Sequence, residues 1–138
     1  GNLVETIGAS AFYNCTGLTS LNIPNSVTEI GNYAFQHCSS LASLIIGNLV
    51  ETIGASAFYN CTSLESVNIP DSVTSIGQDA FTGINSSNFP TEAKITISQN
   101  TVRSLTSDDT LPYTYTSGNE YTGKTFFSSP NLVTLIVR

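Results

Sequence analysis

Three cysteines recur at a constant interval, and they are the side chains with the clearest capacity for chemistry. Cys15, Cys38 and Cys61 lie 23 residues apart. An odd number of thiols raises the question of disulfides or a metal site. In stacked parallel strands, about 4.8 Å apart, equivalent side chains point the same way, so their Cβ atoms stay beyond the ~3.8 Å of a disulfide. We therefore predict three buried, free thiols at an apolar position, which Ile84 occupies in a later repeat.

The single histidine and the carboxylates show no grouping that supports catalysis. A histidine base needs a nucleophile and an orienting partner nearby, but Asn14 and Asn60 lie one interval before and after His37. Four carboxylates lack the spacing of a metal-binding loop: Asp79, Asp108, Asp109 and Glu120. We predict that His37 faces solvent and that these carboxylates are solvated. We expect no catalytic residue, no cofactor and no metal site, so the chain is not expected to be an enzyme.

Composition argues against two further classes of function. Only 10% of the residues are charged, and the net charge is −6. Nucleic-acid binding needs clustered basic residues, and the four present are scattered: Lys94, Arg103, Lys124 and Arg138. The longest apolar runs, Leu44–Ile46 and Leu135–Val137, are far shorter than the roughly 20 residues of a spanning helix. We therefore expect no nucleic-acid partner and no membrane insertion of this segment.

The interval between the cysteines is the period of a repeat that runs through most of the chain. Residues 1–16 recur without change at residues 47–62, and a looser copy lies between them. The shared frame is Ile-Gly-x-x-Ala-Phe-x-x-Cys-x-x-Leu-x-x-Leu-x-Ile-Pro-x-x-Val-x-x. It begins at Ile7, Ile30 and Ile53, and a fourth copy begins at Ile76. A period of this length indicates a solenoid.

Each repeat combines two hydrophobic rhythms. Alternation near residues 21, 44 and 67 predicts half-buried strands that stack as one parallel ladder. The four-residue spacing around Ala34 predicts a short helix or 3-10 turn, and the glycine before it marks a bend that a side chain would resist. Eight side chains of one repeat are expected in the core: Val27, Ile30, Ala34, Phe35, Cys38, Leu41, Leu44 and Ile46.

The register loosens after Phe81. Further strands are expected near residues 95 and 135, which makes five in all. An aromatic insertion at about residues 106–125 is predicted to form a hairpin or loop that protrudes from the edge opposite the strands. We interpret residues 1–138 as a single domain, with regular 23-residue repeats at 1–84 and enlarged repeats at 85–138. The solenoid is expected to be open at both ends, as a fragment of a longer array.

The frame resembles the leucine-rich repeats of the BspA-like type, found in surface proteins of gut and oral bacteria and of some parasitic protists. The matching elements are Ile-Gly-x-x-Ala-Phe-x-x-Cys-x-x-Leu and the Ile-Pro-x-x-Val step, and they cover residues 1–84 closely. The resemblance implies an α/β leucine-rich-repeat solenoid, with a parallel strand ladder on one face and short helices or 3-10 turns on the other. It also implies an extracellular or cell-surface location and a role in adhesion or host-protein binding.

Two surfaces are candidates for binding a partner. Solenoids bind through extended faces, and the outward positions of the strands are Ser20, Asn22, Ser43, Ile45, Ser66, Asn68, Lys94, Thr96, Thr134 and Ile136. The second candidate is the insertion, with Tyr113, Tyr115 and Tyr121, because tyrosine offers rigid amphipathic contact area. The primary interpretation is a non-enzymatic module that binds a protein ligand such as a host extracellular protein. The alternative is a structural spacer or stalk, and the sequence leaves the oligomeric state open.

Overall fold

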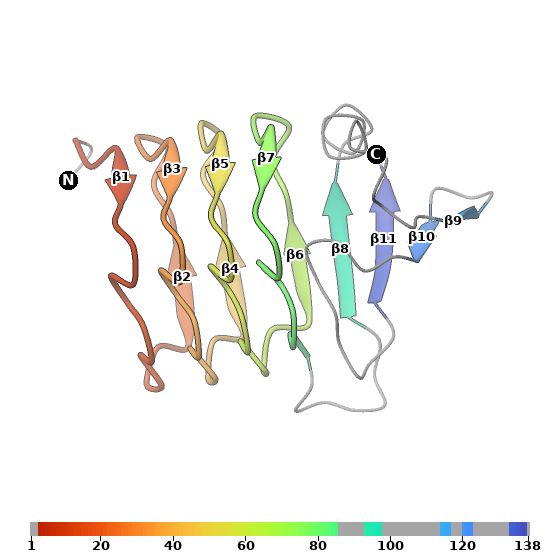
Figure 1. Cartoon of the computed structure of the whole chain (residues 1–138), viewed down its shortest axis with the longest axis horizontal. Helices are drawn as coiled ribbons and strands as arrows, with labels where there is room; N and C mark the ends of the chain where they lie inside the picture. The colour runs from red at the N-terminus through yellow and green to blue at the C-terminus, as the bar shows by residue number, and fades with distance from the viewer. Residues whose placement is uncertain (1–2, 86–92, 98–113, 117–119, 123–132, 138) are drawn as a thin grey trace.

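The computed structural model describes residues 3–85, 93–97, 114–116, 120–122 and 133–137. The eleven strands of these described residues fall into a long-strand series, a short-strand series and a hairpin (Figure 1). The long-strand series is β2 (Ser20–Asn22), β4 (Ser43–Ile45), β6 (Ser66–Asn68), β8 (Ala93–Ile97) and β11 (Val133–Val137). The short-strand series is β1 (Thr6–Ile7), β3 (Glu29–Ile30), β5 (Thr52–Ile53) and β7 (Ser75–Ile76). The hairpin strands are β9 (Thr114–Thr116) and β10 (Glu120–Thr122).

The five long strands lie where the alternating hydrophobic pattern predicts them. β2 pairs with β4, and β6 pairs with β8 and β8 with β11, all in parallel. Each regular strand turns its middle residue inward and its outer residues to solvent. β4 lies beside β6 but is not hydrogen-bonded to it as a ladder. The parallel stacking is therefore confirmed, and the expectation of one unbroken ladder is wrong at this junction.

A second parallel ladder of two-residue strands, β1-β3-β5-β7, was not predicted. Its strands lie in front of β2, β4 and β6 in Figure 1. Its isoleucines pair in register, Ile7 with Ile30, Ile30 with Ile53 and Ile53 with Ile76. Two residues are too few to show an alternating pattern, so the sequence offers no strand signal here.

The segment expected to be a short helix or 3-10 turn is instead a chain of tight turns. No helix occurs in the part of the chain that the structure describes. In the first repeat the N–H of Ala11 donates to Gly8 O at 3.2 Å, whereas the next N–H, of Phe12, donates across to Ala34 O at 2.7 Å. A helix would keep both bonds within the segment. Alternate N–H groups are therefore shared with the neighbouring repeat, and this sharing replaces helical bonding.

The turns require left-handed backbone at two positions of each repeat. Ser10 and Asn14 have φ of 58° and 60°, and Ser56 and Asn60 in the identical copy have 54° and 56°. A φ above zero at the third residue is the mark of a type II turn. Serine tolerates this region less readily than glycine, so the inter-repeat hydrogen bonds must compensate for the strain.

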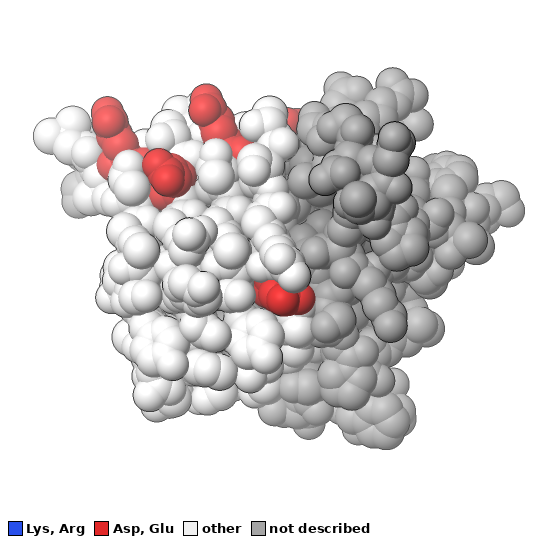
Figure 2. Space-filling view, in the orientation of Figure 1, with Lys and Arg blue, Asp and Glu red and all other residues white. Residues whose placement is uncertain are grey.

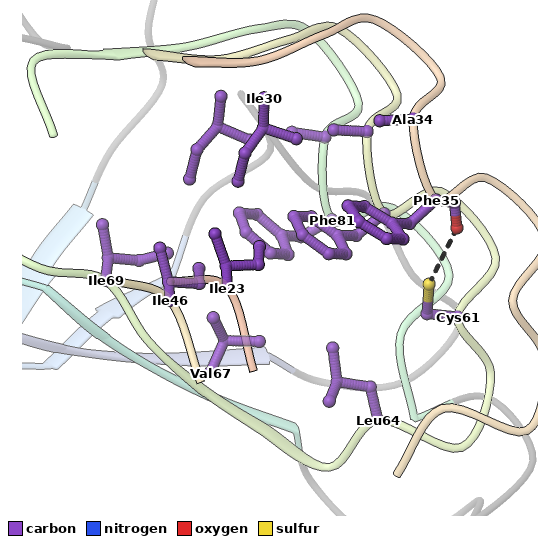
Figure 3. Packing of buried hydrophobic residues seen from close by; sticks show 14 of the residues in the cluster. Ile23, Ile30, Ala34, Phe35, Ile46, Cys61, Leu64, Val67, Ile69 and Phe81 are labelled. Atoms are coloured by element: carbon purple, nitrogen blue, oxygen red, sulfur yellow. Dashed lines mark hydrogen bonds between the residues drawn. The ribbon is translucent and has the colours of Figure 1, made fainter. Parts of the chain in front are cut away.

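The core is a stack of equivalent side chains. The rings of Phe12, Phe35, Phe58 and Phe81 lie parallel at centroid distances of 5.1, 5.3 and 5.3 Å. Figure 3 shows Phe35 and Phe81 of this stack beside a row formed by Ile23, Ile46 and Ile69. The eight predicted core residues of one repeat are buried, except Leu44, which is half-buried. Offset-stacked rings add roughly 0.5–1.5 kcal/mol per pair beyond area burial, so the stack also favours the 23-residue register.

The glycines ahead of the turns have a different role from the predicted one. A Cβ on Gly54 would lie 2.5 Å from Asn32 N, and one on Gly31 would lie 2.7 Å from Ala9 N. Neither glycine has a positive φ. The expectation that a bend requires glycine here is therefore wrong. Glycine is needed because the backbones of adjacent repeats approach too closely for any side chain.

The insertion forms a hairpin in its described part, but its predicted position is wrong. β9 pairs antiparallel with β10, and β10 pairs antiparallel with β11. The sheet order is β6-β8-β11-β10-β9, so the hairpin extends the long-strand sheet instead of projecting from the opposite edge. The unpaired edge of β11 offers backbone donors and acceptors to any nearby strand, and this accounts for the placement.

Candidate protein-binding surface

The outward positions of the long strands form two rows in register, and we call the ten residues together the strand face. One row contains Ser20 opposite Ser43, and Ser66 opposite Lys94, which is in turn opposite Thr134. The other contains Asn22 opposite Ile45, and Asn68 opposite Thr96, which is in turn opposite Ile136. Successive positions within a ladder are about 4.8 Å apart. Each row is divided at the β4–β6 junction.

The regular part of the strand face is polar, with one large apolar side chain. Ile45 is 58% exposed, and the serines and asparagines around it on β2, β4 and β6 are exposed. Thr96 is half-buried, and its neighbours Ile95 and Ile97 are in the core. The side chains of Lys94, Thr134 and Ile136 lie outside the described residues. The arrangement offers short hydrogen-bonding groups around an apolar contact.

The second candidate surface belongs to the sheet of β6, β8 and β11, and not to the separate β2–β4 ladder. Tyr115 on β9 is opposite Tyr121 on β10, and Tyr121 is opposite Leu135 on β11. Tyr113 lies outside the described residues, and so do the side chains of the other two tyrosines. We predicted the strand face and the insertion as separate alternatives. In the structure β11 pairs with β8 on one side and with the hairpin strand β10 on the other, so the two surfaces are connected.

Among Asp, Glu, Lys and Arg, every side chain that the structure describes is acidic. The carboxylates of Glu5, Glu29 and Glu51 are exposed beside the short ladder, and Figure 2 shows red groups without blue ones among the described residues. Asp79 is half-buried rather than fully solvated, and it accepts a hydrogen bond of 2.9 Å from the Thr82 hydroxyl. The surface carries few charges and presents mainly hydroxyl and amide groups.

The three thiols are free, as predicted. Cys38 Sγ donates to Phe12 O at 3.3 Å, and Cys61 Sγ donates to Phe35 O at 3.4 Å. Burial raises the pKa of Cys61 to about 12 and also raises the pKa of Cys38. These two thiols are buried donors that connect repeats, which is more than the apolar filling we predicted. Cys15 is only half-buried, because it lies at the end of the stack.

His37 belongs to an aromatic column that the sequence did not reveal. Its ring lies between Tyr13 and Tyr59, with centroid distances of 5.7 Å to each and interplanar angles of 76° and 77°. The histidine is half-buried, so its ring is only partly open to solvent. Equivalent tyrosines are 46 residues apart in the sequence, and the alternation with histidine becomes visible only when the repeats are stacked.

A shallow groove of about 210 Å³ runs along the short ladder. It is lined by Thr6, Gly8, Glu29, Gly31, Thr52 and Gly54, among others. The described residues contain no group of three His, Cys, Asp or Glu side chains placed to hold a metal ion. They also contain no helix able to cross a membrane. The groove offers no convergent ionisable groups for chemistry.

Two solved structures of bacterial leucine-rich repeat proteins are similar to this chain. The T. pallidum leucine-rich repeat protein is 27% identical, with a TM-score of 0.47, over 67% of this chain and 52% of that one. A leucine-rich repeat protein from Bacteroides ovatus ATCC 8483 is 30% identical, with a TM-score of 0.50, over 67% of this chain and 28% of that one. The chain thus spans about half, or less, of the length of these relatives.

Among curated proteins, none gives a match to this chain. Six copies of the BspA type leucine-rich repeat region match residues 2–107. Such repeats are typical of bacterial surface proteins, and proteins built from them are generally non-catalytic modules for interaction or structural support. The copies cover most of the chain and coincide with the two parallel ladders and the stacked core. The chain therefore belongs to the family of BspA-type leucine-rich repeat proteins.

Proposed function

We propose that this chain is a protein-binding module and that its partner contacts the strand face. The observation that carries this proposal is Ile45, which is 58% exposed at the end of β4 and lies in register with Asn22. An apolar side chain held on a sheet loses little conformational freedom on binding. The neighbouring serines and asparagines supply short, adaptable hydrogen-bonding groups around it. We rank the hairpin tyrosines second, because Tyr115 and Tyr121 lie on β9 and β10, in a different sheet from the β2–β4 ladder that holds Ile45.

We further propose that the protein is located at the cell surface and acts in adhesion, with an extracellular host protein as its ligand. The bacterial surface proteins typical of this family support it. A hydroxyl- and amide-rich surface with few charges also suits a folded protein partner better than a polyanion.

The alternative function is a spacer that projects another domain. The two ladders and the continuous core favour this alternative, because a stack with contacts between every pair of neighbouring repeats transmits its orientation along its length. A spacer does not need an exposed isoleucine on a strand, and for this reason we place binding first.

The test uses the immobilised chain against an array of purified extracellular-matrix and serum proteins. The strand-face variant carries Asn22→Arg and Asn68→Arg, which place two long charged side chains at exposed positions. The matched control carries Ala9→Arg and Gln78→Arg, which add the same charge at exposed positions in the turns. A third variant carries Tyr113→Ala, Tyr115→Ala and Tyr121→Ala.

We expect a bound protein whose dissociation constant rises at least about tenfold in the strand-face variant, as for loss of a central contact. The turn control should bind like the unmodified chain. Binding lost only in the tyrosine variant would move the site to the hairpin. An array without any bound protein would favour the spacer.

A further inference from the structure

The junction between β4 and β6 is the one place in the described part of the chain where two stacked long strands are not hydrogen-bonded. At the β2–β4 junction, Ala42 N and Ser43 N donate to Thr19 O at 2.9 and 3.3 Å. At the other end of these strands, Ile23 N donates to Ile45 O at 2.8 Å. None of these three bonds has a counterpart between β4 and β6 among the described residues.

The 23-residue frame identifies the backbone groups that stay unbonded at the β4–β6 junction. The counterparts of the first two donors are Glu65 N and Ser66 N, which do not bond to Ala42 O. The counterpart of the third is Ile46 N, which does not bond to Asn68 O. All of these residues except Ile46 are exposed, so water reaches their backbone groups and the interruption is tolerated.

The same two repeats remain bonded on their other sides. The short strands β3 and β5 pair in register. In the turns, Phe35 N donates to Ala57 O at 2.8 Å. Shortly before the long strands, Ser63 Oγ donates to Ser39 O at 2.7 Å. The opening is therefore confined to the long-strand side, and the bonded sides form the axis about which it widens.

The closeness of the preceding junction depends on a glycine. A Cβ on Gly47 would lie 2.7 Å from Ile23 O and closer still to Pro24 O. Gly47 has no positive φ, so its own conformation does not require glycine. The end of β4 approaches the first repeat as closely as it does because residue 47 has no side chain.

Pro70 occupies the position of Gly47 in the following repeat. The local turn is the same in both, since Val50 N donates to Gly47 O at 3.3 Å and Val73 N donates to Pro70 O at 3.2 Å. Pro70 has a Cβ and a ring where Gly47 has neither. The third repeat therefore cannot approach the second as closely as the second approaches the first.

We propose that Pro70 acts as a wedge that holds β4 and β6 apart and makes their junction the hinge of the solenoid. The hinge divides the strand face into a β2–β4 part, which carries Ile45, and a β6–β8–β11 part, which carries Asn68. Motion at the hinge changes the spacing of these two parts while the short ladder stays paired.

The consequence of the hinge for binding rests on the proposed function. A partner that contacts both Ile45 and Asn68 spans the hinge, so its binding fixes the angle between the two parts. The hinge itself requires no ligand and is tested on the free chain. A protein array without a bound protein would therefore leave the hinge intact, and loss of the hinge would leave the binding proposal intact.

The first measurement is amide hydrogen exchange of the unmodified chain by NMR. Ile46 N should exchange at least about tenfold faster than Ile23 N and Ile69 N, after correction for intrinsic rates. The two reference amides donate to Ile45 O and Thr96 O at 2.8 and 2.7 Å, so they exchange only after local opening. Equal rates at the three isoleucines would show a closed junction and overturn the proposal.

The second measurement removes the wedge. Pro70→Gly should slow exchange at Ile46 and Ser66 at least about tenfold, and through-bond scalar coupling should reveal a new hydrogen bond from Ile46 N to Asn68 O. Pro24→Gly is the matched control, because it removes a proline from the equivalent position of another repeat. It should leave both rates unchanged. The absence of slowing in Pro70→Gly, or equal slowing in Pro24→Gly, would overturn the wedge.

The reciprocal change transfers the wedge to the preceding junction. Gly47→Pro should open the β2–β4 ladder and raise the exchange rates of Ile23 and Ser43 at least about tenfold, with Ile69 unchanged. Gly47→Ala adds the Cβ alone and provides the same test where the proline variant does not fold. Unchanged rates at Ile23 and Ser43 in the folded variant would overturn the steric cause.

Discussion

Phe12 and Phe58 belong to identical segments, yet Phe12 is 44% exposed and Phe58 is 0% exposed. Phe58 stacks between Phe35 and Phe81, whereas Phe12 stacks on Phe35 alone. Local sequence and local conformation are the same, as the matching left-handed residues show. The burial of a side chain in this fold therefore depends on the repeats that lie on either side of it. Each interior repeat is stabilised on two sides and the end repeat on one.

The largest expected effect is a change in the aromatic stack. Phe58→Ala should lower the free energy of unfolding by about 3–5 kcal/mol, because it opens a cavity between two fixed rings. Phe12→Ala should lower it by less than half as much, because the truncated side chain is already partly in water. Urea denaturation followed by circular dichroism measures both values. Equal losses would show that the two copies are equally packed, and the comparison would fail.

The glycine pair tests close backbone contact in the same two segments. Gly54→Ala places a Cβ 2.5 Å from Asn32 N and should cost about 1–3 kcal/mol, since backbone on both sides must move. Gly8→Ala meets nothing within 4 Å and should be neutral or slightly stabilising. Thermal melting of the two variants supplies the comparison. A destabilised Gly8→Ala variant would mean that glycine is required for its own conformation.

Alkaline pH should destabilise the interior through Cys61. Its pKa rises from 9.0 to about 12 on folding, so the unfolded chain releases this proton first. The contribution is fully present below pH 9 and is lost as the pH rises toward 12. By pH 10 the loss is about 1.4 kcal/mol. Urea midpoints of the chain and of Cys61→Ala at pH 8 and pH 10 isolate this contribution. If the urea midpoints of both proteins fell equally between pH 8 and pH 10, Cys61 would not be the cause of the loss.

The smallest expected effect concerns Asn32, whose side chain bonds to the next repeat, whereas Ala9 at the equivalent position of the first repeat has no such group. Asn32→Ala removes the acceptor for Ala55 N and should cost about 0.5–1 kcal/mol, because the bond is exposed to solvent. The reciprocal change, Ala9→Asn, places an amide at the same position facing Asn32 N and should stabilise by up to about the same amount. Urea midpoints measure both. If neither Asn32→Ala nor Ala9→Asn changed the urea midpoint, the side chain at this position would not contribute to the contact between repeats.

Periodicity made much of the fold predictable. The 23-residue interval identified the solenoid, and alternation located β2, β4 and β6 and the direction of their side chains. The same alternation placed Asn22 and Ile45 on the outward side, where the structure has them. These features follow from local patterns that recur, and recurrence at a fixed interval also specifies which residues stack.

Other features depend on contacts between repeats and left no pattern in the residue types. Ser10 and Asn14 adopt left-handed backbone because alternate N–H groups bond to the next repeat, so the expected helix does not form. Each short strand forms only by pairing with the short strand of the adjacent repeat. The hairpin joins β11 because a free strand edge is available there, which no local signal records.

The sequence by itself determined the period, the inward and outward sides of the long strands, and the stacking of Phe35 on its equivalents. The tertiary structure alone decided that Gly54 is required by a neighbour while Gly8 is not, and that Cys61 is buried while Cys15 is half-buried. The physical reason is that a repeated sequence specifies the contacts a segment is able to make. Its position in the stack decides which of those contacts are made.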